Sequence, residues 1–372
     1  MEIFHSRLLP AIDIPNRPGC ANSERGKSEI MASPSPVPNI LAAIGDTHLV
    51  EMQRYLERRD IRVWAKLEAL NPGGSAKARP AARMIGDAIA DGRIGPDTTI
   101  IESTSGNLGV GLAQVCRFHG LDLICVVDTR TTEVNLQTMR AMGADVRVVT
   151  EPDPDGDLLG ARLKLVARLL ESIPDSYWPD QYSNESNGDS HSAGTMREID
   201  DALDGDIDLL FVAVSTTGTL AGCMDYLHRM QRRTQVVAVD AVGSALFGGR
   251  AGPRRLPGYG ASVESPTSKA VHPDRLIRVS DIDSVVACRR LLDREAVFAG
   301  ASAGAVAAAI SALAPEIDPG SRIAAIFHDG GGGYLDTVYD DAWVARELGY
   351  DAGTVATMVG NRPRTDLTVP TA

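Results

Sequence analysis

One stretch decides the fold class of this chain: Leu209-Leu210-Phe211-Val212-Ala213-Val214, which continues as Ser215-Thr216-Thr217-Gly218-Thr219. The apolar part is typical of a strand that is buried on both faces, as strands of parallel sheets are. Small polar residues follow it, and a helical pattern over residues 220–231 comes next. A buried strand, a small-residue turn and a helix in this order indicate an α/β unit.

The same alternation extends along most of the chain. Further apolar runs bounded by turn residues predict strands at 60–65, 98–102, 121–127, 144–149, 235–239 and 323–326. Helical patterns lie between them, at 81–90, 109–119, 135–142, 158–172, 284–295 and 304–313. We therefore expect an α/β fold with doubly wound, parallel-rich sheets.

The composition fits an ordinary globular protein. Of the 372 residues, 44% are apolar and 23% are charged, which excludes global disorder and a collagen-like or disulfide-scaffold protein. The formal net charge of −12 argues against nucleic acid or an anionic membrane as a partner. No apolar run approaches the roughly 20 residues that span a membrane. The cysteines form no C-x-x-C pair or metal-like spacing, so we expect reduced thiols, no bound metal and a cytoplasmic location.

In open parallel sheets, ligands bind at the carboxyl ends of strands, where loops lead into helices. Four such junctions are rich in Gly, Ser, Thr or Asn: 71–79, 102–109, 215–219 and 300–305. The first places Lys77 in the first turn of a predicted helix. The positive helix end there disfavours the ammonium and lowers its pKa. A neutral amine is what a Schiff base needs, although a solvated lysine in a turn is the alternative.

The other junctions each allow two interpretations. Residues 103–109 contain hydroxyls, an amide and backbone donors that could bind a carboxylate. Alternatively, the same hydroxyls only cap the following helix. Residues 215–219 suit a phosphate, but they are neither a P-loop nor a Rossmann fingerprint. Residues 300–305 indicate small-residue helix packing when taken alone. They also fit the G-x-S-x-G pattern, for which His328 and Asp329 are the only late triad candidates.

Together the four junctions resemble the cysteine synthase and cystathionine β-synthase family of fold-type II enzymes, which depend on pyridoxal 5'-phosphate (PLP). The resemblance covers roughly residues 40–345. It implies two doubly wound α/β domains with the cofactor in the cleft between them. The larger, PLP-binding domain would comprise 39–80 and 180–350, and the smaller, mobile substrate-loop domain 81–179. Residues 1–38, which include a Pro-rich stretch, are expected to be a disordered extension, and 351–372 a C-terminal tail.

The resemblance also implies roles for the cofactor-binding residues. The family's lysine motif N-P-x-x-S-x-K-x-R matches 71–79, so Lys77 would carry PLP as an internal aldimine and then remove the Cα proton. Asn107 would hold the cofactor's phenolic oxygen, and Ser302 would face its pyridine nitrogen. The phosphate loop, usually G-T-G-G-T, would be Ser215, Thr216, Thr217, Gly218 and Thr219, with two glycines replaced.

A second group of residues is expected to bind the substrate. The loop similar to T-S-G-N-T-G implies that the carboxylate is held by Ser103, Thr104, Ser105 and Gly106, with Gln181 nearby. Leu108 stands where that loop usually has Thr. Gly258 and Tyr259 resemble the hinge beside the cofactor. Arg254 and Arg255 precede this hinge, and their forked donors suit a substrate phosphate, although a solvated basic loop is the alternative.

The implied reaction is a β-replacement catalysed by a transferase of amino-acid biosynthesis. An O-activated L-serine, O-phosphoserine in preference to O-acetylserine, would lose its leaving group to give an aminoacrylate, to which a second nucleophile adds. A neutral serine at the ring nitrogen, unlike an aspartate, favours elimination over transamination. The small-molecule substrates would be handled by a homodimer.

The second nucleophile is less defined. The Ser-Thr-Thr loop and residues 132–136 resemble two side branches of the family. One comprises S-sulfocysteine synthases, which add thiosulfate, and the other makes N-(2-amino-2-carboxyethyl)-L-glutamate from O-phosphoserine and glutamate. We favour a sulfur nucleophile, sulfide or thiosulfate, giving L-cysteine or S-sulfocysteine. The glutamate branch and a non-catalytic, partner-binding homologue are the alternatives.

Overall fold

The computed structural model describes residues 36–104, 106–129, 131–152 and 158–360. Most of the predicted N-terminal extension and the end of the predicted C-terminal tail lie outside these ranges. The same is true of Ser105, one of the predicted substrate-binding residues.

Six strands form the larger sheet. Their order is β1 (Leu49–Glu51), β2 (Arg62–Leu67), β10 (Arg322–Phe327), β7 (Leu209–Ala213), β8 (Gln235–Ala241) and β9 (Arg275–Val279). Only β1 runs antiparallel to its neighbour, and the other pairs are parallel. The stretch that opened the sequence analysis is β7, which lies between β10 and β8 with every residue buried. Its continuous apolar run is therefore explained by helices on both faces of the sheet.

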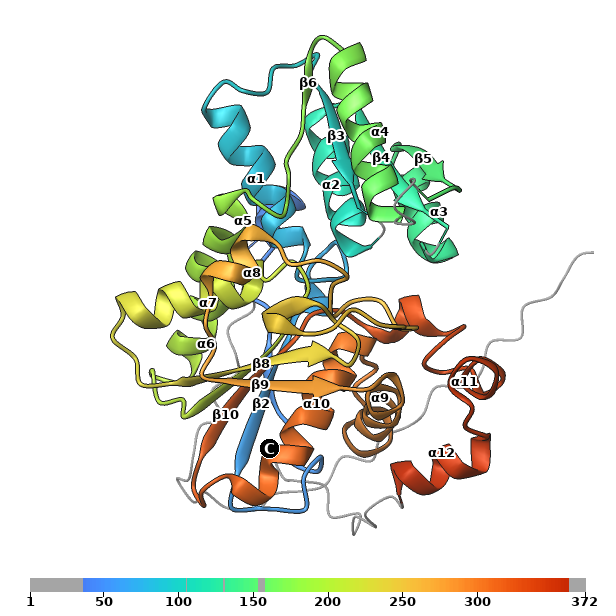
Figure 1. Cartoon of the computed structure of the whole chain (residues 1–372). Coiled ribbons are helices and arrows are strands. Elements are labelled where there is room, and N and C mark those ends of the chain that lie inside the picture. Colours follow the sequence, from blue (N-terminus) through green and yellow to red (C-terminus); the bar gives the residue numbers. More distant parts are fainter. Residues whose placement is uncertain (1–35, 105, 130, 153–157, 361–372) are drawn as a thin grey trace, which may run out of the picture. The chain divides into compact units, whose positions relative to one another are not determined.

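Helices cover both faces of this sheet (Figure 1). On one face, α9 (Asp281–Glu295) and α10 (Ala301–Leu313) share a hydrophobic core with Phe211 of β7. On the other face, α6 (Arg197–Ala202) and α7 (Gly218–Arg229) share a second core with Leu210. Neighbouring residues of one strand thus point into different cores, as the alternation of a β-strand requires.

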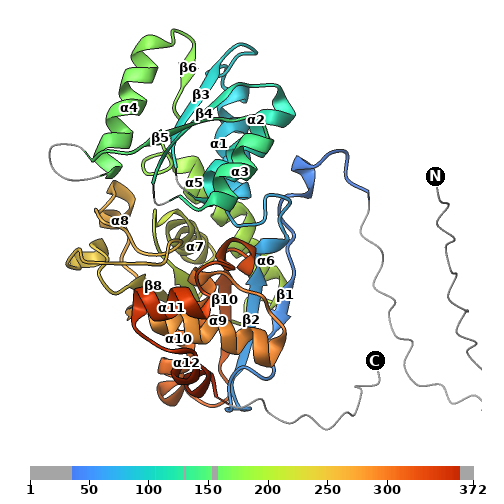
Figure 2. The same cartoon turned by 90° about the vertical axis from the view of Figure 1, so that its right-hand side faces the viewer.

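The smaller sheet is entirely parallel. Its order is β5 (Asp145–Val149), β4 (Leu123–Asp128), β3 (Thr99–Ser103) and β6 (Ser176–Tyr177). Figure 2 shows α4 (Leu158–Ser172) on one side, and α1 (Ala78–Ala90), α2 (Asn107–His119) and α3 (Glu133–Ala141) on the other. The predicted fold class, two doubly wound and parallel-rich sheets, is confirmed. The domain boundaries given above stay a prediction.

Shorter elements complete the described chain. Single helical turns lie at Leu41–Ala43, Glu68–Leu70, Leu246–Gly248, Ala314–Glu316 and Gly331–Tyr334, and longer helices are α5 (Glu185–Ser190), a π-helix (His191–Met196), α8 (Pro266–Ala270), α11 (Asp341–Leu348) and α12 (Ala352–Val359). The helix α12 lies in the segment predicted as a tail, and its Val355 joins the core of the larger sheet. Among the described residues, no helix is both long and apolar enough to cross a membrane.

Candidate active site

Among the described α-helices that follow a loop, four begin without a capping side chain. The N-cap residues of α1, α2, α7 and α10 are Lys77, Gly106, Thr217 and Gly300, and none of them accepts a hydrogen bond from the first turn. By contrast, α3, α5, α8, α9, α11 and α12 each start with a Thr, Asn, Ser or Asp that does. Uncapped first turns leave backbone N–H donors for an anion. At 103–109 the N-cap residue is Gly106, which has no side chain that could cap the helix.

Lys77 lies between the larger sheet and α2. The backbone N–H of Ala76 donates to His328 O at 2.7 Å, just beyond the end of β10. A Cβ added to Gly111 of α2 would lie 2.9 Å from the Lys77 carbonyl, so only glycine allows this approach. The Lys77 ammonium donates to Thr216 Oγ1 at 3.2 Å, and burial lowers its pKa to about 8. A buried amine with a lowered pKa, next to the predicted phosphate loop, is suited to forming a Schiff base.

Asp329 connects the two residues that were predicted to hold the cofactor ring. Asn107 Nδ2 donates to Asp329 Oδ2 at 2.8 Å, and Ser302 Oγ donates to Asp329 Oδ1 at 3.4 Å. The Tyr334 hydroxyl also donates to this carboxylate, at 2.8 Å. Burial raises the pKa of Asp329, and these three hydrogen bonds oppose the rise. The sequence analysis considered Asp329 only as a triad candidate and missed its place beside Asn107 and Ser302, because its contacts come from segments far apart in the chain.

The predicted hinge lies against the same cluster. Gly258 has φ = 98°, and a Cβ there would be 3.0 Å from Tyr334 Oη and 3.8 Å from Ser302 Cβ. Gly260 N donates to Val214 O at 2.6 Å, and Ser215 Oγ donates to Gly260 O at 3.1 Å. These contacts join the hinge to the start of the predicted phosphate loop.

The phosphate loop contains an unusual backbone conformation. Thr217 has φ = 66°, which lies in the left-handed region that β-branched residues rarely adopt. This conformation suits the glycine that is usually found in the phosphate loop. Behind the loop, the buried ring of His191 lies 3.2 Å from Thr219 Oγ1 through Nε2 and 3.0 Å from Thr195 Oγ1 through Nδ1. Burial, with the charges of Lys77 and Arg79, lowers the His191 pKa well below its usual value. A neutral imidazole therefore orients Thr219.

Glu102 holds the substrate loop and the Gln181 segment together. Ser103 N donates to Glu102 Oε1 at 2.8 Å, and Trp178 Nε1 donates to the same oxygen at 3.1 Å. The backbone of Gln181 lies close enough to this carboxylate to lower its pKa. The two predicted substrate segments are thus neighbours.

The residues around the hinge differ in how they could serve a substrate. Arg254 donates to Tyr259 O at 3.2 Å and to Ser262 Oγ at 3.0 Å. The exposed Arg255 side chain lies 3.7 Å from Glu347. The Tyr259 side chain is buried in the core of the larger sheet. In this structure Arg254 stabilises the hinge, and Tyr259 offers the site its backbone only.

Buried polar side chains also lie near the carboxyl ends of β3 and β4. Arg162 of α4 lies 3.3 Å from Asp128, the last residue of β4. Among the described residues, Arg162 Nε, Thr131 Oγ1 and Ser103 Oγ are buried without a hydrogen-bond partner. Because β3 and β4 are parallel neighbours, these atoms follow the same edge of the sheet. No sequence motif marks Arg162, which lies in an ordinary helical pattern.

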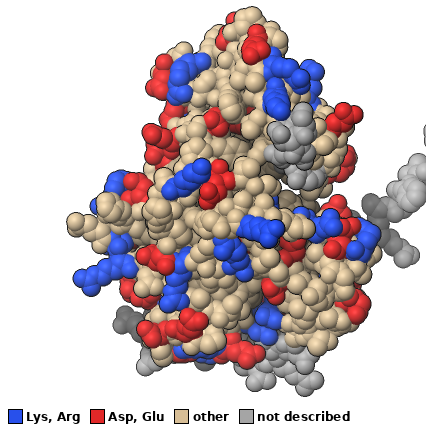
Figure 3. Space-filling view, viewed as in Figure 1, with Lys and Arg blue, Asp and Glu red and all other residues tan. Residues whose placement is uncertain are grey.

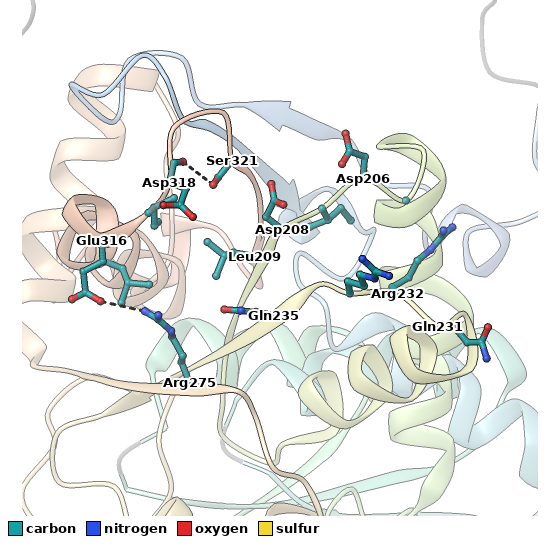
Figure 4. Close-up of a pocket in the computed structure, with 15 residues that line it drawn as sticks. Asp206, Asp208, Leu209, Gln231, Arg232, Gln235, Arg275, Glu316, Asp318 and Ser321 are labelled. Atoms are coloured by element: carbon teal, nitrogen blue, oxygen red, sulfur yellow. Dashed lines mark hydrogen bonds and ion pairs between the residues drawn. The ribbon is translucent and has the colours of Figure 1, made fainter.

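A cavity of about 600 Å³ lies elsewhere, at the amino ends of β7 and β8 (Figure 4). It is lined by charged residues such as Asp206, Asp208 and Arg275. Arg275 forms an ion pair with Glu316. None of the predicted site residues lines it. Acidic and basic side chains are interspersed on the face drawn in Figure 3. In the described part of the chain, no group of His, Cys, Asp or Glu side chains could hold a metal ion.

The residues around Lys77 fit PLP. The Lys77 amine is buried and has a lowered pKa, and the uncapped start of α7 offers N–H donors for a phosphate. Asn107 and Ser302 both donate hydrogen bonds to the carboxylate of Asp329. When bound, PLP withdraws electrons from the Cα of an amino acid. Lys77 would hold it covalently, residues 215–219 would hold its phosphate, and Asn107 and Ser302 would contact the ring.

Comparisons with known proteins agree with this fit. A family model described as "Pyridoxal-phosphate dependent enzyme" matches residues 40–329. An N-(2-amino-2-carboxyethyl)-L-glutamate synthase from Ralstonia nicotianae is 45% identical over 315 residues, which cover 85% of this chain and 93% of that protein. The crystal structure of an O-acetylserine dependent cystathionine β-synthase from Helicobacter pylori matches with 32% identity and a TM-score of 0.76, over 82% of this chain and 98% of that one.

A hydrogen sulfide-producing enzyme from Fusobacterium nucleatum matches with 28% identity and a TM-score of 0.75, over 81% of this chain and 99% of that one. These matches span nearly the whole of the described sheets. The chain therefore belongs to the family of pyridoxal-phosphate dependent enzymes, as a fold-type II member that catalyses β-replacement.

Proposed function

We propose that the protein makes N-(2-amino-2-carboxyethyl)-L-glutamate from O-phosphoserine and glutamate. The Cβ–O bond of the donor breaks and phosphate leaves with the electron pair. A bond then forms between Cβ and the glutamate nitrogen, which loses a proton. The observation that carries this proposal is the 45% identity to the Ralstonia nicotianae synthase over 93% of its length. The sulfur nucleophile favoured by the sequence analysis stays a prediction and is the second candidate, since two structural relatives have names that refer to sulfur chemistry.

The chain's own residues have defined tasks in this reaction. Lys77, once displaced from the cofactor by the donor's amine, is the base for the Cα proton, and its lowered pKa of about 8 suits proton transfer near neutral pH. The backbone N–H groups at the start of α2, which has no capping side chain, and the loop 103–106 bind the donor's carboxylate. Gly258 lets the hinge approach Ser302 and Tyr334 closely, which excludes water from that side.

Glutamate also brings a side-chain carboxylate, which needs a cation. Arg162 is buried at the edge of the smaller sheet that carries the substrate loop, where its Nε lies 3.3 Å from Asp128 Oδ2 without completing a hydrogen bond among the described residues. A guanidinium has five N–H donors in a planar fork, so an arginine that is paired with an aspartate can also contact a substrate carboxylate. We therefore assign Arg162 to the second substrate. Arg254 and Arg255 are already engaged with the hinge and with Glu347, so they support a phosphate donor only weakly.

A matrix of donors and nucleophiles tests the proposal. The PLP-loaded protein is offered O-phosphoserine or O-acetylserine, each with glutamate, thiosulfate or sulfide, and products are identified by mass spectrometry. We expect the glutamate adduct, formed fastest from O-phosphoserine. S-Sulfocysteine or cysteine as the dominant product would refute the proposal and support the sulfur branch.

Two variants of α4 test the second-substrate site. Arg162→Lys keeps the charge but loses the forked geometry. Such charge-assisted hydrogen bonds contribute about 1.5–3 kcal/mol, so we expect KM for glutamate to rise by roughly 10–100-fold while KM for the donor changes little. Arg168→Lys, on the exposed side of the same helix, is the matched control and should change neither. Equal rises for both substrates would contradict the assignment.

A further inference from the structure

Glu102 is a buried carboxylate that the reaction described above does not use. Its side chain is about 1% exposed and lies in β3, directly before the substrate loop. Its Oε1 accepts hydrogen bonds from Ser103 N and Trp178 Nε1. Among the described residues, its Oε2 has no hydrogen-bond partner. Burying an ionised carboxylate costs free energy when one of its oxygens accepts no hydrogen bond.

Among the described residues, no cation is among the main electrostatic influences on Glu102. The charged group that acts on it is Asp180, on the loop after β6, and its electrostatic effect is repulsive. The charge of Glu102 also raises the pKa of Cys125, on β4, and of Tyr182. Both of these groups are uncharged when protonated, so neither offsets the charge of Glu102. The buried guanidinium of Arg162, on α4, pairs with Asp128. Burial raises the pKa of Glu102 to about 7, against the lowering by its hydrogen bonds.

An arriving amino acid adds a negative charge beside this group. The α-carboxylate is expected in the loop 103–106, whose first backbone N–H already donates to Glu102. Like charges in a poorly solvated site disfavour each other's ionised form. Protonation of Glu102 removes this repulsion and weakens its hold on Ser103 N, which then becomes available to the substrate.

We propose that Glu102 is a positioning residue that takes up a proton from solvent when an amino acid's α-carboxylate enters the adjacent loop. Only an O–H bond forms, and the proton returns to solvent when the amino acid leaves. Substrate binding is therefore coupled to pH. This inference rests on the proposed role of loop 103–106 in carboxylate binding, but not on the identity of the second nucleophile.

The test uses binding of L-alanine, which has the α-carboxylate but no leaving group. Binding to the PLP-loaded protein is followed by the absorbance of bound PLP between about pH 6 and pH 9. We expect the wild-type Kd to rise about tenfold per pH unit above about pH 7, because one proton is taken up with each ligand. In Glu102→Gln, an isosteric neutral variant, this additional dependence should vanish. The titration of the alanine amine is common to both proteins and cancels in the ratio of their Kd values.

A second variant covers the possibility that Glu102→Gln folds poorly. Asp180→Asn removes the like charge, and Asn tolerates the φ of 49° found at this position. It should move the inflection of the wild-type profile to lower pH. Glu171→Gln, an exposed change on α4, should leave the profile unchanged. Parallel pH profiles in wild type, Glu102→Gln and Asp180→Asn would overturn the inference, as would failure of the wild type to bind L-alanine at about pH 6. A missing glutamate product in the donor and nucleophile matrix would instead refute the proposed function alone.

Discussion

Replacing Arg79 with Met should destabilise the protein far more than the same change four residues later in the helix. Arg79 is buried and donates from Nε and Nη2 to both oxygens of Glu68, at 2.7 and 2.8 Å. It also donates to both oxygens of Glu198, at 2.6 and 2.7 Å. Lys66 completes the network with a 2.7 Å ion pair to Glu198. The change to Met would leave two buried carboxylates with one cation.

The expected loss follows from two lines of reasoning. Breaking a buried ion pair by removing one partner costs about 3–5 kcal/mol. The second line of reasoning uses the pKa of Glu198. Burial raises this pKa, but the hydrogen bonds from Arg79 and Lys66 outweigh that effect and bring it to about 2, whereas an ordinary glutamate has a pKa of 4.5. That difference corresponds to roughly 3 kcal/mol. An unfolding entropy of about 2 cal/mol/K per residue then predicts a fall in Tm of about 4–7 °C.

Thermal unfolding of the PLP-loaded proteins, at one scan rate, measures this difference. Arg83→Met is the control, because Arg83 lies on the same helix in an exposed ion pair with Asp87 that contributes under about 1 kcal/mol. The lowered pKa of Glu198 also sets the pH dependence. The network's contribution is complete above about pH 4.5 and is lost as the pH falls towards 2, so the gap between wild type and Arg79→Met should narrow on acidification. A similar Tm for Arg79→Met and Arg83→Met would refute the reasoning.

Four further outcomes are expected. Lys77→Ala should abolish turnover and leave PLP removable by gel filtration, whereas a borohydride-trapped adduct on another lysine would contradict the assignment of the amine. Ser302→Asp should shift the absorbance of bound PLP and slow release of the donor's leaving group, because an anion beside the ring nitrogen favours its protonation; unchanged spectra would show that Ser302 does not face the ring. Arg254→Ala should reduce kcat/KM alike for O-phosphoserine and O-acetylserine, since its guanidinium donates to Tyr259 O, and a loss confined to O-phosphoserine would instead establish a phosphate contact. Thr217→Gly should raise Tm by about 1 °C, because relief of a positive φ at a β-branched residue is worth roughly 1 kcal/mol; a lower Tm would mean that the side chain stabilises the loop more than its backbone strains it.

Local sequence predicted the long elements well. The strands at 209–214, 121–127 and 323–326 correspond to β7, β4 and β10, and the helix at 158–172 to α4. Runs of buried apolar residues and helical periodicity carry this information within one segment. Short strands gave no such signal: β1 has three residues and β6 two.

The helices between residues 185 and 202 show why local composition is a poor guide to helix formation. This segment contains Gly188 and Gly194 and many small polar residues, which form weak helices. It is helical because it packs on α7, where a Cβ on Gly222 would lie 2.1 Å from Gly188 O. Tertiary packing, rather than intrinsic propensity, stabilises these turns.

The sequence by itself determined the α/β class and the four loops at the carboxyl ends of strands, and it predicted Lys77 as the reactive amine. Each of these is a property of neighbouring residues, so a linear pattern records it. Only the tertiary structure decided that Asp329 joins Asn107 to Ser302, that Arg254 donates to the hinge, and that Glu102 is buried with one oxygen unpartnered among the described residues. Hydrogen-bond partners, and the loss of solvent that shifts a pKa, arise where distant segments meet. No pattern within a single segment specifies those contacts.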